Sequence, residues 1–245
     1  MRYLILSDIH ANLEALEAVL AAGDEYGQVL MLGDVVGYGA DPNAVIDRLQ
    51  TLPLAATIRG NHDKVAAGLA DAEDFNHIAR HAVTWTAAAL TDVNRAWIAA
   101  LPQGPVVIDD GLEICHGTPF DEDVYVFDED EASHAIAAAQ RPLCLFGHTH
   151  VPAAFRLAGR QLRFLGPPQG TPFTIDLEHE ARYLVNCGAV GQPRDGDPRA
   201  AYGIVDTAAR TLTIHRIEYD VAGAQAKIIE AGLPRVLAER LLLGR

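Results

Sequence analysis

The chain has 245 residues, of which 49% are hydrophobic and 21% are charged, as expected for a globular protein with a sizeable core. No stretch approaches the roughly 18 consecutive apolar residues that a transmembrane helix requires, and the amino terminus lacks the pattern of a signal peptide. We therefore expect a cytoplasmic protein without a membrane partner. The net charge is −14 and no basic cluster is present, so we expect no long nucleic acid as a partner and favour a small substrate. A nuclease that acts on a short exposed end of DNA is a weaker alternative.

The three cysteines, Cys115, Cys144 and Cys187, each lie in or beside an apolar run. An odd number in such positions indicates buried packing residues and not a disulfide framework. Because His116 follows Cys115, a catalytic thiol is an alternative. Neighbours on a strand point to opposite faces, however, so we favour the packing role.

Strands and helices alternate over the first 60 residues. Residues 2–7, 29–33 and 54–60 are short apolar runs that predict strands. Between them, residues 12–22 carry apolar side chains on one helical face, and residues 41–50 begin with the Asp-Pro pair that is typical of a helix start. This βαβαβ opening implies parallel strands with right-handed crossovers.

Residues 64–101 predict a helical insertion, and residues 222–243 predict a C-terminal helical segment that Pro234 divides. The sequence between them favours strands joined by short turns, at residues 106–117, 142–146, 153–165 and 202–219. No repeat or linker interrupts the chain, so we expect one domain over residues 1–245, with an α/β fold and two mixed sheets.

Polar side chains follow five of the predicted strands, in the stretches "LSDIHAN", "LGDVVGYG", "IRGNHD", "ICHGTP" and "FGHTH". Ligands of α/β sheets lie outside the carboxyl ends of the strands. We therefore expect one pocket to gather the metal-competent side chains of Asp8, His10, Asp34, Asn61, His116, His148 and His150.

Imidazole and carboxylate donors suit manganese, iron and zinc, and the absence of thiolates argues against a structural zinc site. Seven donors exceed what one tetrahedral ion requires, so they indicate two ions that share a bridging carboxylate. Two divalent ions roughly 3.5–4 Å apart stabilise an in-line phosphoryl displacement and lower the pKa of a bridging water from about 15.7 toward about 7.

Taken in order, Asp8-x-His10, Gly33-Asp34, Gly60-Asn61-His62-Asp63, His116 and Gly147-His148-x-His150 resemble the motifs of the calcineurin-like metallophosphoesterase family. The segments "GDVVGYGADPNAVI" and "GAVGQPRDGDPRAAY" are similar to those of its small single-domain bacterial and archaeal phosphodiesterases, and they extend the resemblance to about residue 206. The resemblance implies a four-layer α/β/β/α sandwich with a two-metal site.

The resemblance also implies a role for each matched residue. Asp8, His10 and His150 would hold the first ion, Asn61, His116 and His148 the second, and Asp34 would bridge both. His62 would act as general acid at the leaving-group oxygen while metal-bound hydroxide attacks in line, and Asp63 would shape the turn. Manganese is the expected metal, with iron or zinc as alternatives.

Three further residues are candidates for substrate binding. The guanidinium of Arg194 suits a phosphate, although Asp195 and Asp197 could instead hold it in a local salt bridge. Phe75 and Asn76, in the helical insertion, could line a pocket for a base or sugar, with ordinary packing as the alternative.

Two other polar patterns are interpreted as surface features. His77 and His81 have the i, i+4 spacing of a zinc-protease motif, but Ile78 stands where that motif needs glutamate, so we expect exposed helical histidines. The acidic run at 121–131 predicts a solvated edge.

The sequence therefore favours a two-metal phosphodiesterase that acts on small nucleotides, cyclic ones included. A phosphomonoesterase or protein phosphatase is the alternative within the same chemistry. A non-catalytic binding scaffold on the same fold is disfavoured because every matched ligand and His62 are present. The natural substrate, the native metal and the oligomeric state have no signature in the sequence.

Overall fold

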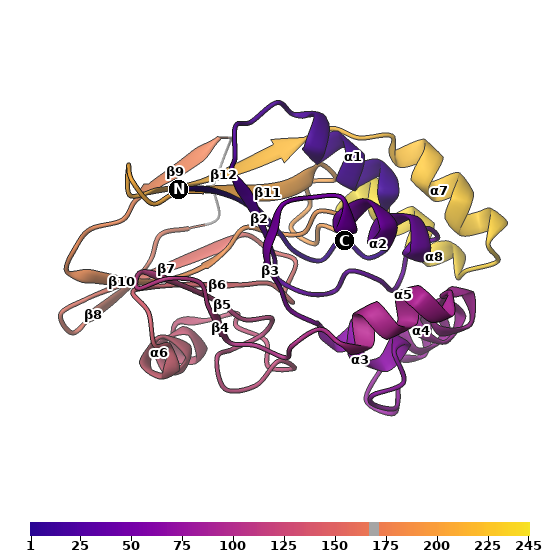
Figure 1. Ribbon diagram of the computed structural model, residues 1–245, viewed down its shortest axis with the longest axis horizontal. Helices are drawn as coiled ribbons and strands as arrows, with labels where there is room; N and C mark the ends of the chain where they lie inside the picture. Colours follow the sequence, from indigo (N-terminus) through magenta and orange to yellow (C-terminus); the bar gives the residue numbers. More distant parts are fainter. Residues whose placement is uncertain (167–171) are drawn as a thin grey trace.

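The computed structural model describes residues 1–166 and 172–245, and these contain twelve strands and eight helices (Figure 1). Two mixed sheets of six strands form the centre of the molecule. The first has the order β3 (Leu54–Thr57), β2 (Gln28–Met31), β1 (Arg2–Leu6), β11 (Ala200–Asp206), β12 (Thr211–Ile217), β9 (Phe173–Asp176). The second has the order β4 (Val106–Val107), β5 (Leu112–Ile114), β6 (Leu143–Phe146), β10 (Ala181–Asn186), β7 (Ala153–Ala158), β8 (Gln161–Phe164).

The amino-terminal half of the first sheet has the predicted βαβαβ arrangement. Strands β1, β2 and β3 pair in parallel. Helices α1 (Leu13–Ala21) and α2 (Pro42–Gln50) connect them. Asn12 caps α1 by accepting a hydrogen bond from the Ala15 amide, and Pro42 occupies the first position of α2. The hairpins β4–β5, β7–β8 and β11–β12 are antiparallel, as the turn signals predicted.

Alternation along β1 shows how the layers form. Tyr3 and Ile5 pack in the cluster between the two sheets, whereas Leu4 and Leu6 pack on the opposite face, against α1 and α2. Burial of each such leucine or isoleucine contributes about 1.5–3 kcal/mol. Phe146 of β6 packs on the outer face of the second sheet, beneath α6 (Glu129–Ala138). The result is the expected four-layer α/β/β/α sandwich.

The helical insertion is shorter and more interrupted than predicted. Its helices are α3 (Asn61–Ala66), α4 (His77–Ala89) and α5 (Asp92–Ala99), while residues 67–76 lie outside any helix. Gly68 has a φ of +80° directly after α3, a conformation that ends a helix. The C-terminal segment forms α7 (Val221–Glu230) and α8 (Arg235–Leu243) on either side of Pro234, as predicted.

The prediction of a solvated acidic edge at 121–131 is wrong for Glu122, which is buried. Glu129 is exposed, as predicted, and begins α6. Asp128 accepts a hydrogen bond from the Glu131 amide, and Glu131 reaches back to the Asp128 amide, so the acidic residues form a capping box. Negative charge in the first turn also suits the helix dipole.

The remaining surface predictions agree with the structure. His77 and His81 are exposed on α4. All three cysteines are buried and unbonded. In the two described ranges, every helix is too short or too polar to span a bilayer.

Candidate metal centre

The carboxyl ends of β1 and β2 from one sheet and β5 and β6 from the other meet at one edge of the sandwich. The side chains that follow these strands form two clusters in which the donor atoms lie within 4.8 Å of one another. The first cluster consists of Asp8, His10, Asp34 and His150. The second consists of Asp34, His116 and His148, so Asp34 belongs to both. Six of the seven predicted ligands are thus brought together.

Every imidazole in these clusters donates its other ring nitrogen to a backbone carbonyl. The Nδ1 atoms donate at 3.0 Å from His10 to Val36, at 2.8 Å from His116 to Leu32 and at 2.6 Å from His150 to Gln192. His148 donates instead from Nε2, to the Asp123 carbonyl at 3.1 Å. A carbonyl only accepts, so in each ring that is neutral the remaining nitrogen presents a lone pair to the cluster, which is the arrangement found around metal-binding histidines.

These lone pairs face one another and the carboxylates. His10 Nε2 lies 3.1 Å from His150 Nε2, and 3.5 Å from Asp34 Oδ2. His150 Nε2 lies 3.4 Å from Asp8 Oδ1. Two acceptor nitrogens at such a separation repel each other unless a cation lies between them. The first cluster therefore fits a bound cation.

The protonation equilibria favour the same conclusion. Burial lowers the pKa values of His10 and His150 well below the usual range and that of His148 to about 3, so these rings stay neutral. Burial acts in the same direction on His116, but Asp34 outweighs it and raises its pKa to about 10. The shared carboxylate thus attracts positive charge at the centre of the site.

Asn61, the seventh predicted ligand, begins α3 at the end of the segment after β3. Its Oδ1 atom is buried, and no donor in the described part of the chain reaches it. The same holds for His116 Nε2, which lies 3.4 Å from Asp34 Oδ2 without an aligned hydrogen bond. An unsatisfied buried polar atom costs about 1–3 kcal/mol, which metal coordination would offset. The residues therefore fit a dinuclear divalent metal site.

The backbone around the site is strained. Five of the clustered residues have left-handed φ angles: Asp8 at 53°, His10 at 48°, Asp34 at 55°, His148 at 66° and His150 at 60°. This conformation costs a non-glycine residue roughly 1–2 kcal/mol and is concentrated at functional sites. Strand exits of this shape turn consecutive polar side chains toward one point.

Asp63 and Asn186 brace these turns from outside the clusters. The Asp63 carboxylate accepts hydrogen bonds from the amides of Val35, Val36 and Gly60 at 2.9–3.1 Å, which is the turn-shaping role predicted for it. Asn186, at the end of β10, donates to the Gly147 carbonyl at 2.7 Å and to Thr149 Oγ1 at 3.0 Å. Asn186, like the predicted ligands, follows an apolar stretch of the sequence.

His62 lies beside the clusters and not within them. Its amide donates to Asp34 Oδ1 at 2.9 Å, and its ring packs between Tyr38 and Phe75 with centroid distances of 4.4 and 4.7 Å. A Cβ atom at Gly37, where φ is +95°, would lie 2.5 Å from His62 Nδ1, so the backbone must be glycine there. Burial lowers the pKa of His62 to about 4.

A cavity of about 440 Å³ adjoins the second cluster. Asn61, His62 and His148 line its inner end, and Phe75, Asn76 and Tyr125 contribute to its walls. The Asn76 side chain also caps α4, so only part of its amide faces a ligand. The charged residues of the lining are Lys64, Asp71, Asp74 and Asp123.

Arg194 lies near the first cluster, where its amide donates to the His150 carbonyl at 3.2 Å. Its guanidinium contacts Gln192 Oε1 and lies 5.6 Å from the centre of the Tyr38 ring. The alternative in which neighbouring aspartates hold it is not observed, because Asp195 pairs with Arg216 and Asp197 with Arg199. Tyr38 was also missed from the sequence, although it stands between two glycines in the Asp34 motif.

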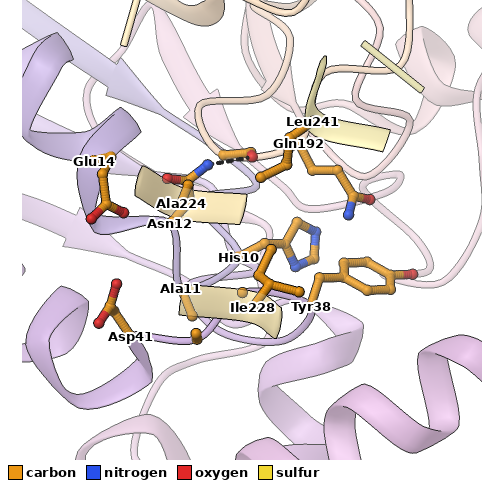
Figure 2. Close-up of a pocket in the computed structure, with 13 residues that line it drawn as sticks. His10, Ala11, Asn12, Glu14, Tyr38, Asp41, Gln192, Ala224, Ile228 and Leu241 are labelled. Carbon is orange, nitrogen blue, oxygen red and sulfur yellow. Dashed lines mark hydrogen bonds between the residues drawn. The ribbon is translucent and has the colours of Figure 1, made fainter. Parts of the chain in front are cut away.

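The opposite side of the first cluster is closed by α7 and α8. Figure 2 shows His10 and Tyr38 side by side there, facing Ile228 and Leu241. The space that remains is about 10 Å³, enough for one water molecule. A substrate must therefore approach from the large cavity.

Residues 1–210 match the calcineurin-like phosphoesterase superfamily domain. The chain belongs to this superfamily. A metallophosphoesterase from Sphaerobacter thermophilus is similar, with a TM-score of 0.87 and 38% identity over 100% of this chain and 99% of that one. Uncharacterized protein MJ0912 from Methanocaldococcus jannaschii is 34% identical over 98% of this chain and 97% of its own length.

A more distant structure agrees in fold. The hypothetical protein PH1004 from Pyrococcus horikoshii OT3 has a TM-score of 0.79 at 19% identity, with 100% of this chain and 98% of that chain covered. The family resemblance inferred from the motifs, to small bacterial and archaeal metallophosphoesterases, is thereby confirmed. Helices α7 and α8 lie after residue 210, where the match to the superfamily domain ends. The alignments with the two relatives nevertheless cover 98–100% of this chain.

Metal binding should stabilise the folded protein through Asp34. With Mn²⁺ at 100 times its dissociation constant, one bound ion adds about 2.7 kcal/mol, which raises the melting temperature by about 5–11 °C for a chain of this size. Asp34→Asn should lose most of this shift in differential scanning fluorimetry. Asp24→Asn, which removes a carboxylate bonded to Tyr202 away from the clusters, should keep it. An undiminished shift in Asp34→Asn would contradict the bridging role.

Proposed function

We propose that the protein is a metal-dependent phosphodiesterase that cleaves small nucleotides, cyclic ones included. The observation that carries the proposal is a pair of donor clusters that share Asp34, the second of which adjoins a single large cavity beside His62. Two divalent ions bound there, manganese being our choice, would polarise the phosphate and lower the pKa of a water. The buried, free cysteines support a reducing, cytoplasmic location.

The chain's own residues would orient the ester and move its proton. His62 is placed between the clusters and the cavity, so its imidazole would donate a proton to the departing oxygen. Asp34 favours the protonated form of this ring, which opposes the effect of burial. Arg194, fixed by Gln192, would neutralise a phosphate oxygen at the first cluster.

The charges around the cavity favour a diester over a monoester. Asp71 and Asp74 are exposed on its lining, and Lys64 is already paired with Glu122 and Asp123. A diester carries one negative charge at pH 7, whereas a monoester carries nearly two because its second pKa is about 6. The monoester therefore meets more repulsion from the same carboxylates.

The aromatic residues on the cavity walls support a nucleotide as the substrate. Phe75 and Tyr125 offer ring surface on which a base could stack, and stacking of this kind contributes about 1–3 kcal/mol per base. The volume of about 440 Å³ suits a mononucleotide or a dinucleotide. The net charge of −14 opposes binding of a long polymer.

A substrate panel tests the preference for diesters. With Mn²⁺ present, kcat/KM for bis(p-nitrophenyl) phosphate and 2′,3′-cyclic AMP should exceed that for p-nitrophenyl phosphate. The double variant Asp71→Asn/Asp74→Asn should reduce the ratio of diester to monoester kcat/KM, because monoester hydrolysis should increase several-fold. Asp92→Asn/Asp130→Asn, which removes two exposed charges outside the cavity, should leave the ratio unchanged. Faster hydrolysis of the monoester by the wild-type protein would favour a phosphomonoesterase or protein phosphatase.

The role of His62 is tested separately from metal binding. His62→Ala should lower kcat by roughly 10²-fold or more, because general acid catalysis contributes 10²–10⁴-fold. Its manganese content after dialysis, measured by elemental analysis, should match the wild type because His62 lies outside both clusters. The loss of kcat in His62→Ala should be smaller for substrates that release p-nitrophenoxide, because this leaving group needs little protonation. Wild-type turnover by His62→Ala on an alkyl ester would refute this role.

A further inference from the structure

We infer that Glu122 is a positioning residue for the second donor cluster. The inference rests on the proposed metal-dependent function, and it concerns the loop 117–127 that follows His116. The acidic run in this loop predicted solvent exposure, yet only 5% of Glu122 is exposed. A buried carboxylate needs compensating charge and hydrogen bonds, and its partners show what the loop is attached to.

Glu122 is held by two cations that flank Asn61 in the sequence. Arg59 donates to it from Nε and from Nη2, both at 3.1 Å, and Lys64 donates from Nζ at 3.2 Å. The two-point contact with the guanidinium fixes direction as well as distance. Lys64 also pairs with the Asp123 side chain at 2.5 Å. The triad of Arg59, Glu122 and Lys64 therefore joins the start of α3 to the loop.

The same loop contacts the two histidines of the second cluster. The Asp123 carbonyl accepts the Nε2 hydrogen of His148, and the Tyr125 ring stacks on that imidazole with centroids 3.9 Å apart. At Gly117, the neighbour of His116, an added Cβ atom would lie 2.6 Å from the Val124 carbonyl oxygen. The loop therefore passes directly over Gly117. This one loop thus contacts His148, directly follows His116, and is tied through Glu122 to the residues on either side of Asn61.

The first cluster has separate supports. His10 and His150 donate to the carbonyls of Val36 and Gln192, which lie in other segments. A change at Glu122 should consequently loosen one cluster and leave the other intact. Loss of a residue that orients a metal ligand typically weakens metal binding about 10–100-fold.

Calorimetric titration of the metal-free, full-length protein with Mn²⁺ tests the inference without using activity. The wild type should bind two ions. Glu122→Gln, which keeps the shape and removes the charge, should bind one ion with wild-type affinity and the second about 10–100-fold more weakly. Glu17→Gln removes a carboxylate that pairs with Arg48 between α1 and α2, and it should behave as wild type.

Unchanged affinity for both ions in Glu122→Gln, or equal weakening of both in a folded protein, would overturn the inference while leaving the proposed function standing. If circular dichroism shows that Glu122→Gln does not fold, Glu122→Asp replaces it, because aspartate keeps the charge but is too short for the same contact with Arg59. It should likewise weaken binding of one Mn²⁺ ion and leave the other unchanged. A wild-type protein that binds fewer than two ions would overturn the inference together with the proposed function.

Discussion

The structure depends on the convergence of unprotonated imidazole nitrogens and carboxylate oxygens at one edge of the sandwich. His10 and His150 point acceptor nitrogens at each other across 3.1 Å, beside the buried carboxylates of Asp8 and Asp34. Without positive charge this arrangement is unfavourable, because the groups are desolvated and repel one another. The strained left-handed exits of the strands show that the fold maintains it all the same. A pair of divalent cations would supply the missing attraction, and the residues present fit such a pair.

The layers of the sandwich explain why the donors meet. Two sheets packed face to face bring strand ends from distant parts of the sequence to the same edge, and short exits keep the polar side chains close to the core. Helices α7 and α8 seal one side behind Tyr38, while α3 and the loop 117–127 flank the open side. Because one side is closed and the other open, the cavity lies on the open side, together with His62 and the aromatic residues of its walls. A substrate can enter from that side.

Sequence patterns predicted the features that are encoded within a few consecutive residues, such as strand ends and turns. Apolar runs that end in aspartate, asparagine or histidine located all seven proposed ligands, because strand termini and turn residues are encoded over a few positions. Strand β10 lies at the centre of the second sheet but was not predicted, and α6 was hidden by its acidic first turn. The contact between Arg59 and Glu122 spans 63 positions, so no local pattern reveals it. The same applies to Asn186, which supports the turn at Gly147 from a different strand.

Anomalous diffraction from crystals grown with Mn²⁺ tests the central claim most directly. The account predicts two peaks roughly 3.5–4 Å apart, one within reach of Asp8, His10 and His150 and the other within reach of Asn61, His116 and His148, with Asp34 between them. A single peak, or peaks located away from these side chains at saturating Mn²⁺, would contradict it.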